Sequence, residues 1–182
     1  CIRDRVSRGH QVTIINSDSS EMHSTLPWIH VSIQAQAMRG RKASVLGTKM
    51  RQWLKEYDCP KDTVAIVDWQ IAAKLAKLLQ MNSIPWILMD RSPPADSNIL
   101  SRLQWYFWKR SWRLVKRHSR GVGCVVSSAH KEFVAQKIGL TEDKMIVIPA
   151  GVDTEVFHNG EKTAQLQLGY HGKIDDNRLS LI

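Results

Sequence analysis

Residues 63–90, TVAIVDWQIAAKLAKLLQMNSIPWILMD, contain the pattern that decides the fold. Residues 63–68 form a short apolar run of the kind that makes a buried strand. Residues 69–80 then carry apolar side chains at helical spacing, and residues 84–90 form a second apolar run. A strand, a helix and another strand in this order predict a parallel sheet covered by helices.

The same alternation continues in both directions along the chain, without the Asn-Gly signals of hairpins. We therefore expect an α/β fold with a Rossmann-like, mostly parallel sheet and helices on both faces. The further strands are predicted at residues 11–15, 122–127 and 145–149, and the further helices at residues 31–56 (one or two helices with a basic outer face), 99–118 and 129–139.

The charge of the chain favours an anionic partner. Its 182 residues include 26 Lys and Arg against 17 Asp and Glu, a formal net charge of +9. Phosphate, nucleic acid and acidic lipid all fit such an excess. Three widely spaced cysteines indicate a reducing, cytoplasmic compartment without a metal site, and no run of about 20 apolar residues is present. We expect a cytoplasmic protein, at most peripheral on the inner face of a membrane.

Ligands of parallel sheets bind at the carboxyl ends of the strands. Five residues that follow predicted strands are therefore candidates for binding a ligand: Asp68, Trp69, Asp90, Arg91 and Ser127. The tryptophan offers a flat aromatic face to such a ligand. For Asp68 and Ser127 an alternative stays open, because each also precedes a helix and is a suitable N-cap.

The stretch at 99–118 combines tryptophan with Lys and Arg. At 3.6 residues per turn, one face carries Leu100, Leu103, Phe107 and Leu114, which we expect in the core. Tryptophans gather on another side beside a basic stripe, a composition suited to an anionic bilayer surface. The expected membrane contacts are Trp105, Lys109, Trp112, Arg113 and Lys116. The alternative is that the tryptophans pack internally and the cations are solvated.

Three segments in order resemble glycosyltransferase family 4, of the GT-B type. SRGHQVTII at residues 7–15 is similar to a helix-to-strand junction of the family. VIPAGVDTEVF at 147–157 is similar to its interdomain link, and LGYHGKIDDNR at 168–178 to the first strand and phosphate loop of its second domain. GCVVSSAHKEFV, at 123–134, matches the strand, serine and helix before the link.

The resemblance implies three parts: an acceptor-side domain at 1–149 without its first strand, a linker at 150–166, and the start of a donor-binding domain at 167–182. The chain would thus be truncated at both ends and inactive alone. Gly172, Lys173 and Arg178 fall on the phosphate loop and would bind the donor diphosphate. The five candidates at the strand ends would bind the acceptor, with the face of Trp69 against a sugar ring. The implied reaction of the parent is a retaining hexosyl transfer from an NDP-sugar to a glycan, lipid or lipid-linked acceptor, without metal or cofactor. The catalytic residues are not identified.

Several positions depart from the family pattern. Ala150 replaces an Asn of the link, Leu179 replaces a Gly of the phosphate loop, and Gly121 and Gly123 replace an Ala-Asp pair. MDRSPPAD, at residues 89–96, stands where many members carry a His.

Two other classes of function remain open from the sequence. One is another GT-B enzyme, such as a sugar-nucleotide epimerase. The other is a non-catalytic basic module that binds membrane or nucleic acid, although no helix-turn-helix, RRM or zinc signature is present, so no specific nucleic acid is expected.

Overall fold

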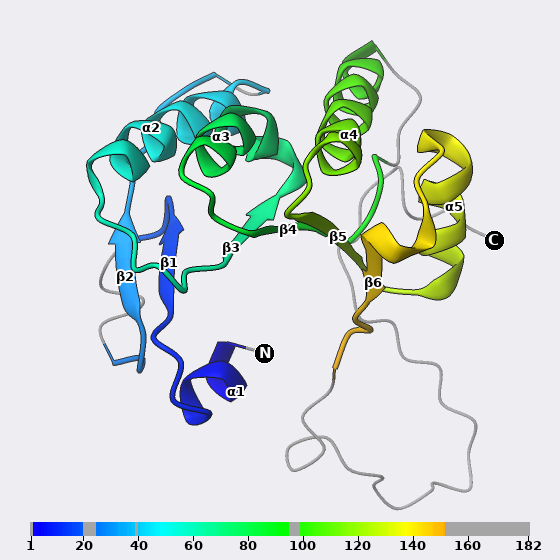
Figure 1. Cartoon of the computed structure of the whole chain (residues 1–182). Helices are drawn as coiled ribbons and strands as arrows, with labels where there is room; N and C mark the ends of the chain where they lie inside the picture. Colours follow the sequence, from blue (N-terminus) through cyan, green and yellow to red (C-terminus); the bar gives the residue numbers. More distant parts are fainter. Residues whose placement is uncertain (1, 20–24, 39, 95–98, 152–182) are drawn as a thin grey trace, which may run out of the picture. The chain divides into compact units, whose positions relative to one another are not determined.

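The computed structural model describes residues 2–19, 25–38, 40–94 and 99–151 (Figure 1). By internal contacts the chain divides into two compact units, Cys1–Gly151 and Val152–Ile182. All described helices and strands belong to the first unit. The linker and second domain expected at 150–166 and 167–182 fall almost wholly outside the described residues, and those boundaries stay predictions.

A four-stranded parallel sheet forms the centre of this unit. Its strands are β3 (Ala65–Asp68), β4 (Trp86–Asp90), β5 (Gly121–Val125) and β6 (Met145–Val147), paired in the order β3-β4-β5-β6 (Figure 1). Each strand lies within or one residue beside a segment that the apolar pattern predicts. The expected α/β class with a parallel sheet is confirmed.

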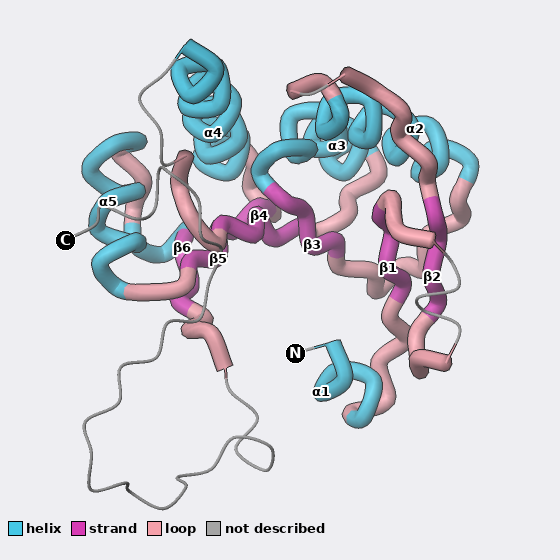
Figure 2. The backbone as a smooth tube through the Cα atoms, turned by 180° about the vertical axis from the view of Figure 1, so that it is seen from behind, coloured by secondary structure: helices cyan, strands magenta, loops and turns pink. Residues whose placement is uncertain are grey.

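Three helices connect these strands: α3 (Trp69–Met81), α4 (Ile99–Arg117) and α5 (Ser128–Ile138). The strands lie in chain order, and right-handed crossovers between successive parallel strands place all three helices on one face of the sheet. α2 (Lys42–Glu56) packs against α3 on that side. α1 (Ile2–Ser7) lies on the other side of the strands from α2, α3 and α4, as Figures 1 and 2 both show.

A second, two-stranded sheet contains a strand that the sequence pattern misassigns. β1 (Thr13–Asn16) pairs in parallel with β2 (Ile29–Ser32). The helical prediction for residues 31–56 is therefore wrong at its start, and helix α2 begins only at Lys42. The strand depends on hydrogen bonds to β1, which lies 16 positions earlier in the register, and a local periodicity cannot detect that partner.

Local signals set the ends of several elements. Asp68 caps α3 by accepting a hydrogen bond from the Gln70 amide at 2.8 Å. Ser127 caps α5 through the His130 amide at 3.1 Å. The predicted end of this helix at Gly139 is confirmed, with a left-handed φ of 65° that favours glycine. A 3-10 turn, η2 (Glu142–Lys144), then leads into β6.

The orientation of α4 differs from the prediction. Trp108, Trp112 and Val115 have no exposed surface, whereas Leu103 is 52% exposed and Phe107 37% exposed. The expected core face at Leu100, Leu103, Phe107 and Leu114 is thus wrong at Leu103 and Phe107, although Leu114 does pack against the core. The side chain of Leu100 lies outside the described residues. The tryptophans bury more apolar area, and their indole N–H groups find a partner in the sheet.

Candidate functional site

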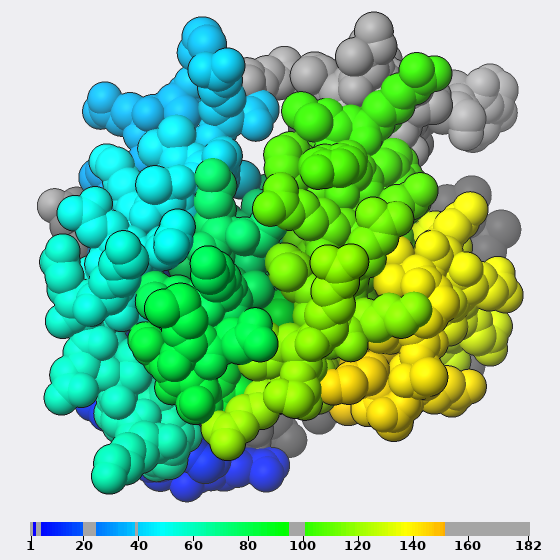
Figure 3. All heavy atoms as spheres, turned by 45° about the horizontal axis from the view of Figure 1, so that its top comes forward, coloured from blue at the N-terminus to red at the C-terminus, as the bar shows by residue number. Residues whose placement is uncertain are grey.

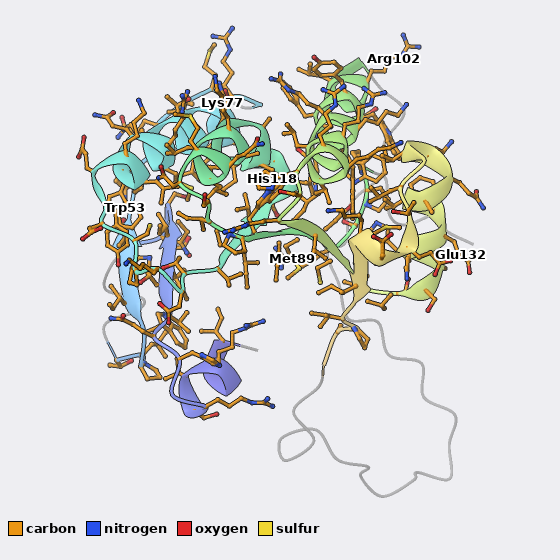
Figure 4. The ribbon with its side chains drawn as sticks, viewed as in Figure 1. Trp53, Lys77, Met89, Arg102, His118 and Glu132 are labelled. Carbon is orange, nitrogen blue, oxygen red and sulfur yellow. The ribbon has the colours of Figure 1, made fainter. Side chains whose placement is uncertain are left out.

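The carboxyl ends of β3 and β4 bring two acidic residues to the same edge of the sheet. Asp68 ends β3 and Asp90 ends β4, and the parallel register places Asp68 opposite Met89. Side chains alternate along a strand, so Asp90 faces the helices while Met89 projects from the opposite face (Figure 4).

Asp90 is fully buried and joins two helices to the sheet. Its Oδ2 atom accepts hydrogen bonds from the Trp108 Nε1–H at 2.6 Å and the Trp112 Nε1–H at 2.9 Å. Nε2 of His130, on α5, lies 3.3 Å from the same oxygen. These four residues form the Asp90 cluster. Its carboxyl group therefore has no surface on which to receive an acceptor, which corrects the predicted direct contact by Asp90.

The second oxygen of Asp90, Oδ1, is buried without a hydrogen-bond partner among the described residues. A buried acceptor without a partner is unfavourable by about 1–3 kcal/mol. The cluster therefore places two hydrogen bonds on one oxygen, with the His130 Nε2 atom 3.3 Å away but not hydrogen-bonded, and leaves the other oxygen unused. Its stability is thus sensitive to each of the two indole donors.

The pKa of Asp68 is set by its burial and by charged neighbours that include Arg91. Burial raises the pKa of the Asp68 carboxyl, and the hydrogen bond from Gln70 and the charge of Arg91 oppose this rise. The charge of Asp90 adds to it. Arg91 is exposed, so it places a cation at this edge of the sheet.

Trp69 starts α3 directly after Asp68 and is half-buried against the core. Its backbone oxygen accepts a hydrogen bond from the Ser111 hydroxyl of α4 at 2.7 Å. Ser127 is exposed at the next strand end, where its hydroxyl caps α5. The cap interpretation therefore holds for Ser127 as it does for Asp68. A cap still leaves hydroxyl or carboxyl oxygen for a further hydrogen bond.

His130 belongs to the cluster, although the sequence places it only near the cleft and assigns it no binding role. It lies three residues after the N-cap Ser127, a spacing that turns a side chain of the first helical turn toward the sheet. A signal was present in the serine and histidine of GCVVSSAHKEFV, but the partner Asp90 lies 40 positions earlier in the chain. No local pattern relates the two.

The five expected membrane contacts differ in how much of each side chain is exposed. Trp112 is buried in the Asp90 cluster, so its assignment as a membrane contact is wrong. Trp105 is half-buried and packs on the rings of Trp108 and Phe133. Of the three cations in the set, Lys109 is half-buried, whereas Arg113 and Lys116 are exposed.

Two hollows lie on the described surface away from the Asp90 cluster. One, of about 290 Å³, lies beside α2 and is lined by Trp53, Lys49 and the end of β2. The other, of about 410 Å³, lies between α5 and β6 and includes Glu132 and Ser128. Figure 4 labels Trp53 and Glu132, one from each hollow. The second hollow includes Ser128, the residue after the N-cap Ser127, so it is closer in sequence to the predicted acceptor edge than the first hollow.

The remaining predictions of the sequence concern metal ions, membrane spans and the donor loop. Among the described residues no three His, Cys, Asp or Glu side chains gather as a metal site would require. None of the described helices is both long enough and apolar enough to cross a bilayer. Gly172, Lys173 and Arg178 lie outside the described residues.

Comparison with known families agrees with this architecture. A model of the family described as Glycosyltransferase Family 4 matches residues 3–156, which include every described strand and helix α2 to α5. No curated protein gave a significant match. The matched region holds the parallel sheet, its polar carboxyl edge and the Asp90 cluster. The chain therefore belongs to glycosyltransferase family 4.

Proposed function

We propose that the protein transfers a hexosyl group from an NDP-sugar to an acceptor bound at the carboxyl edge of the four-stranded sheet, with retention of configuration. The observation that supports this is the exposed Arg91 beside Asp68 at adjacent strand ends in a chain of this family. Arg91 offers a charged donor to acceptor hydroxyl or phosphate oxygens, and the free oxygen of Asp68 accepts from a hydroxyl.

In this proposal the Asp90 cluster positions the site without touching substrate. It holds the middle of α4 and the start of α5 against the end of β4, so that Trp69 and Ser127 keep a fixed separation from Arg91. Rigid placement of this kind is what orientation of two reactants requires.

We further propose that residues 1–149 bind the acceptor, that 150–166 act as a linker, and that 167–182 begin the donor-binding domain. Gly172, Lys173 and Arg178 would then stabilise the negative charge that develops on the departing diphosphate. No metal is needed in this scheme, because these cations and backbone amides neutralise the diphosphate. The leaving phosphate itself accepts the acceptor proton.

The proposed acceptor is a lipid or lipid-linked glycan, reached by a cytoplasmic protein that associates peripherally with the inner face of a membrane. The net charge of +9 favours an anionic membrane surface. A glycan in solution is the competing acceptor, and it would leave the transfer chemistry unchanged.

A donor screen tests the proposal on the protein encoded by its full open reading frame. Release of nucleoside diphosphate from UDP-, GDP- and ADP-hexoses is measured with and without polyprenyl phosphate, diacylglycerol and oligosaccharide acceptors. We expect release that depends on one acceptor, with product stereochemistry by NMR matching the donor. Inversion of the donor sugar at carbon 2 without transfer would identify an epimerase and overturn the proposal.

The variant Arg91→Gln tests the acceptor edge. We expect a KM for the acceptor raised about 10-fold or more with the KM for the donor unchanged, because a charged hydrogen bond contributes about 1.5–3 kcal/mol. Arg51→Gln, which neutralises an exposed cation of α2, is the matched control and is expected to leave both constants unchanged. Equal effects of the two variants would contradict the placement of the acceptor at this edge.

A further inference from the structure

One side of α4 is exposed and combines apolar with basic residues. At 100° per residue its members fall within about a third of the helix circumference. Leu103 is 52% and Tyr106 54% exposed, and Phe107, 37% exposed, stacks edge-on against Tyr106. The outer face of α4 consists of these three residues and of Arg110, Arg113 and Arg117, all three exposed. Figure 3 shows α4, in green, open to the viewer between α3 and α5.

The charge of this helix is of one sign. Its Lys and Arg residues are Arg102, Lys109, Arg110, Arg113, Lys116 and Arg117, and it contains no Asp or Glu. In the part of the chain that the structure describes, none of the six forms an ion pair with a carboxylate. Among the described residues, the outer face of α4 therefore has no neutralising carboxylate partner, and its positive potential is directed outward.

The apolar and basic residues are separated along the helix axis. Leu103, Tyr106 and Phe107 lie in its first half, and the three arginines lie in its second half. Leu114, which falls in the same arc, packs inward against the core instead. α4 follows the end of β4 and returns to the start of β5, so its first half is the end nearer the carboxyl edge of the sheet. Arg102 extends from that end of the helix, far from His118 at the other (Figure 4).

We propose that the outer face of α4 binds an anionic lipid bilayer, with Leu103, Tyr106 and Phe107 entering the headgroup boundary and Arg110, Arg113 and Arg117 contacting anionic headgroups. This differs from the surface that the tryptophans suggest, because Trp108 and Trp112 are buried on the opposite side of the helix. An aromatic and apolar cluster beside Arg is the composition of an interfacial helix.

The exposed apolar cluster favours lipid over nucleic acid as the anionic partner. Arginines alone would suit phosphates of either kind, but contiguous exposed Leu, Tyr and Phe side chains gain free energy by leaving water for an acyl boundary. Leu103, Tyr106 and Phe107 lie at the end of α4 that is nearer the predicted acceptor edge. Insertion would therefore bring Arg91 toward the bilayer surface. The inference names the surface through which the proposed peripheral association would occur, so it rests on that part of the proposed function and not on the transfer chemistry.

Co-sedimentation with sized vesicles tests the proposal directly. The protein is mixed with phosphatidylcholine vesicles and with vesicles containing 30% phosphatidylglycerol, a composition of about one anionic lipid in three. We expect binding only to the anionic vesicles, weakened as NaCl is raised. The variant R110Q/R113Q/R117Q should weaken binding about 100-fold, because each cation near an anionic surface contributes about 1 kcal/mol.

The apolar part is tested by L103S/Y106S/F107S. We expect about 10-fold or greater loss of vesicle binding with an unchanged urea unfolding midpoint, since all three side chains are exposed. The matched controls are K42Q/R51Q/K55Q, three exposed cations of α2, and M81S, an exposed apolar residue at the end of α3. Both controls should bind vesicles as the unchanged protein does.

Three results would overturn the proposal: equal binding to neutral and anionic vesicles, equal loss in the α2 control, or tighter binding to a 30-base-pair DNA duplex than to anionic vesicles at the same salt. The assay needs no sugar donor, so its outcome is independent of transfer. Vesicle binding without any hexosyl transfer would reject the proposed transfer alone, whereas transfer to a water-soluble acceptor without vesicle binding would reject this inference and the proposed membrane association but leave the transfer standing.

Discussion

Replacement of Asp90 by Ala tests the organisation of the site most directly. The change leaves the Nε1–H groups of Trp108 and Trp112 buried without an acceptor. An unsatisfied buried donor costs about 1–3 kcal/mol, so two donors predict a loss of about 2–6 kcal/mol in the free energy of unfolding. At about 2–4 °C per kcal/mol for a chain of this size, the melting temperature should fall by about 10 °C.

The measurement is urea unfolding followed by fluorescence of the chain's seven tryptophans, which include the two indoles of the cluster. Asp90→Asn keeps an amide oxygen as acceptor and is expected to lose only about half as much, since bonds to a neutral acceptor are about half as strong. Part of the loss in the Ala variant is offset, because a buried polar group with one unpaired oxygen is removed.

A double-mutant cycle separates the hydrogen bonds from other effects. Trp108→Phe should destabilise the unchanged protein more than it destabilises Asp90→Ala, with a coupling of about 1 kcal/mol or more. Trp86→Phe is the matched control, because the buried Trp86 Nε1–H has no hydrogen-bond partner in the described part of the chain and should show no coupling. A loss below about 1 kcal/mol for Asp90→Ala, or equal coupling in both cycles, would refute the proposed role of the cluster.

Four further substitutions, at three positions, follow from the packing and the pKa shifts. Gly123→Ala should destabilise by several kcal/mol in urea unfolding, because its Cβ would overlap the ring of Trp112; a soluble variant of unchanged midpoint would contradict this packing. Asp68→Ala should lower the free energy of unfolding by about 1 kcal/mol, because the helix cap is lost. Asp68→Asn keeps the cap but removes a carboxyl whose pKa is raised by burial. The stability of the Asn variant should therefore fall less than that of the unchanged protein as pH increases above about 4. Burial, with the nearby charge of Lys144, lowers the pKa of His118, so stability should decrease as pH falls below about 6.5, and His118→Gln should flatten that slope in a series of urea midpoints.

Much of the fold follows from local rules, which is why the sequence alone could predict it. The apolar runs around residues 65–68 and 86–90, with a helical period between them, define a strand, a helix and a parallel strand whatever the rest of the chain does. Asp68, Ser127 and Gly139 sit at helix ends because a short side chain or a missing Cβ suits those positions.

The tertiary structure decided what depends on partners far away in the chain. β2 forms because it pairs with β1, and its sequence alone therefore predicts the start of a helix instead. On α4 both a leucine face and a tryptophan face had the right period. The tryptophans went inside because Asp90 receives their N–H groups and Gly123 leaves space for the ring of Trp112. Hydrogen bonds and shape between distant residues, which no local period encodes, selected the buried face and with it the surface that remains outside.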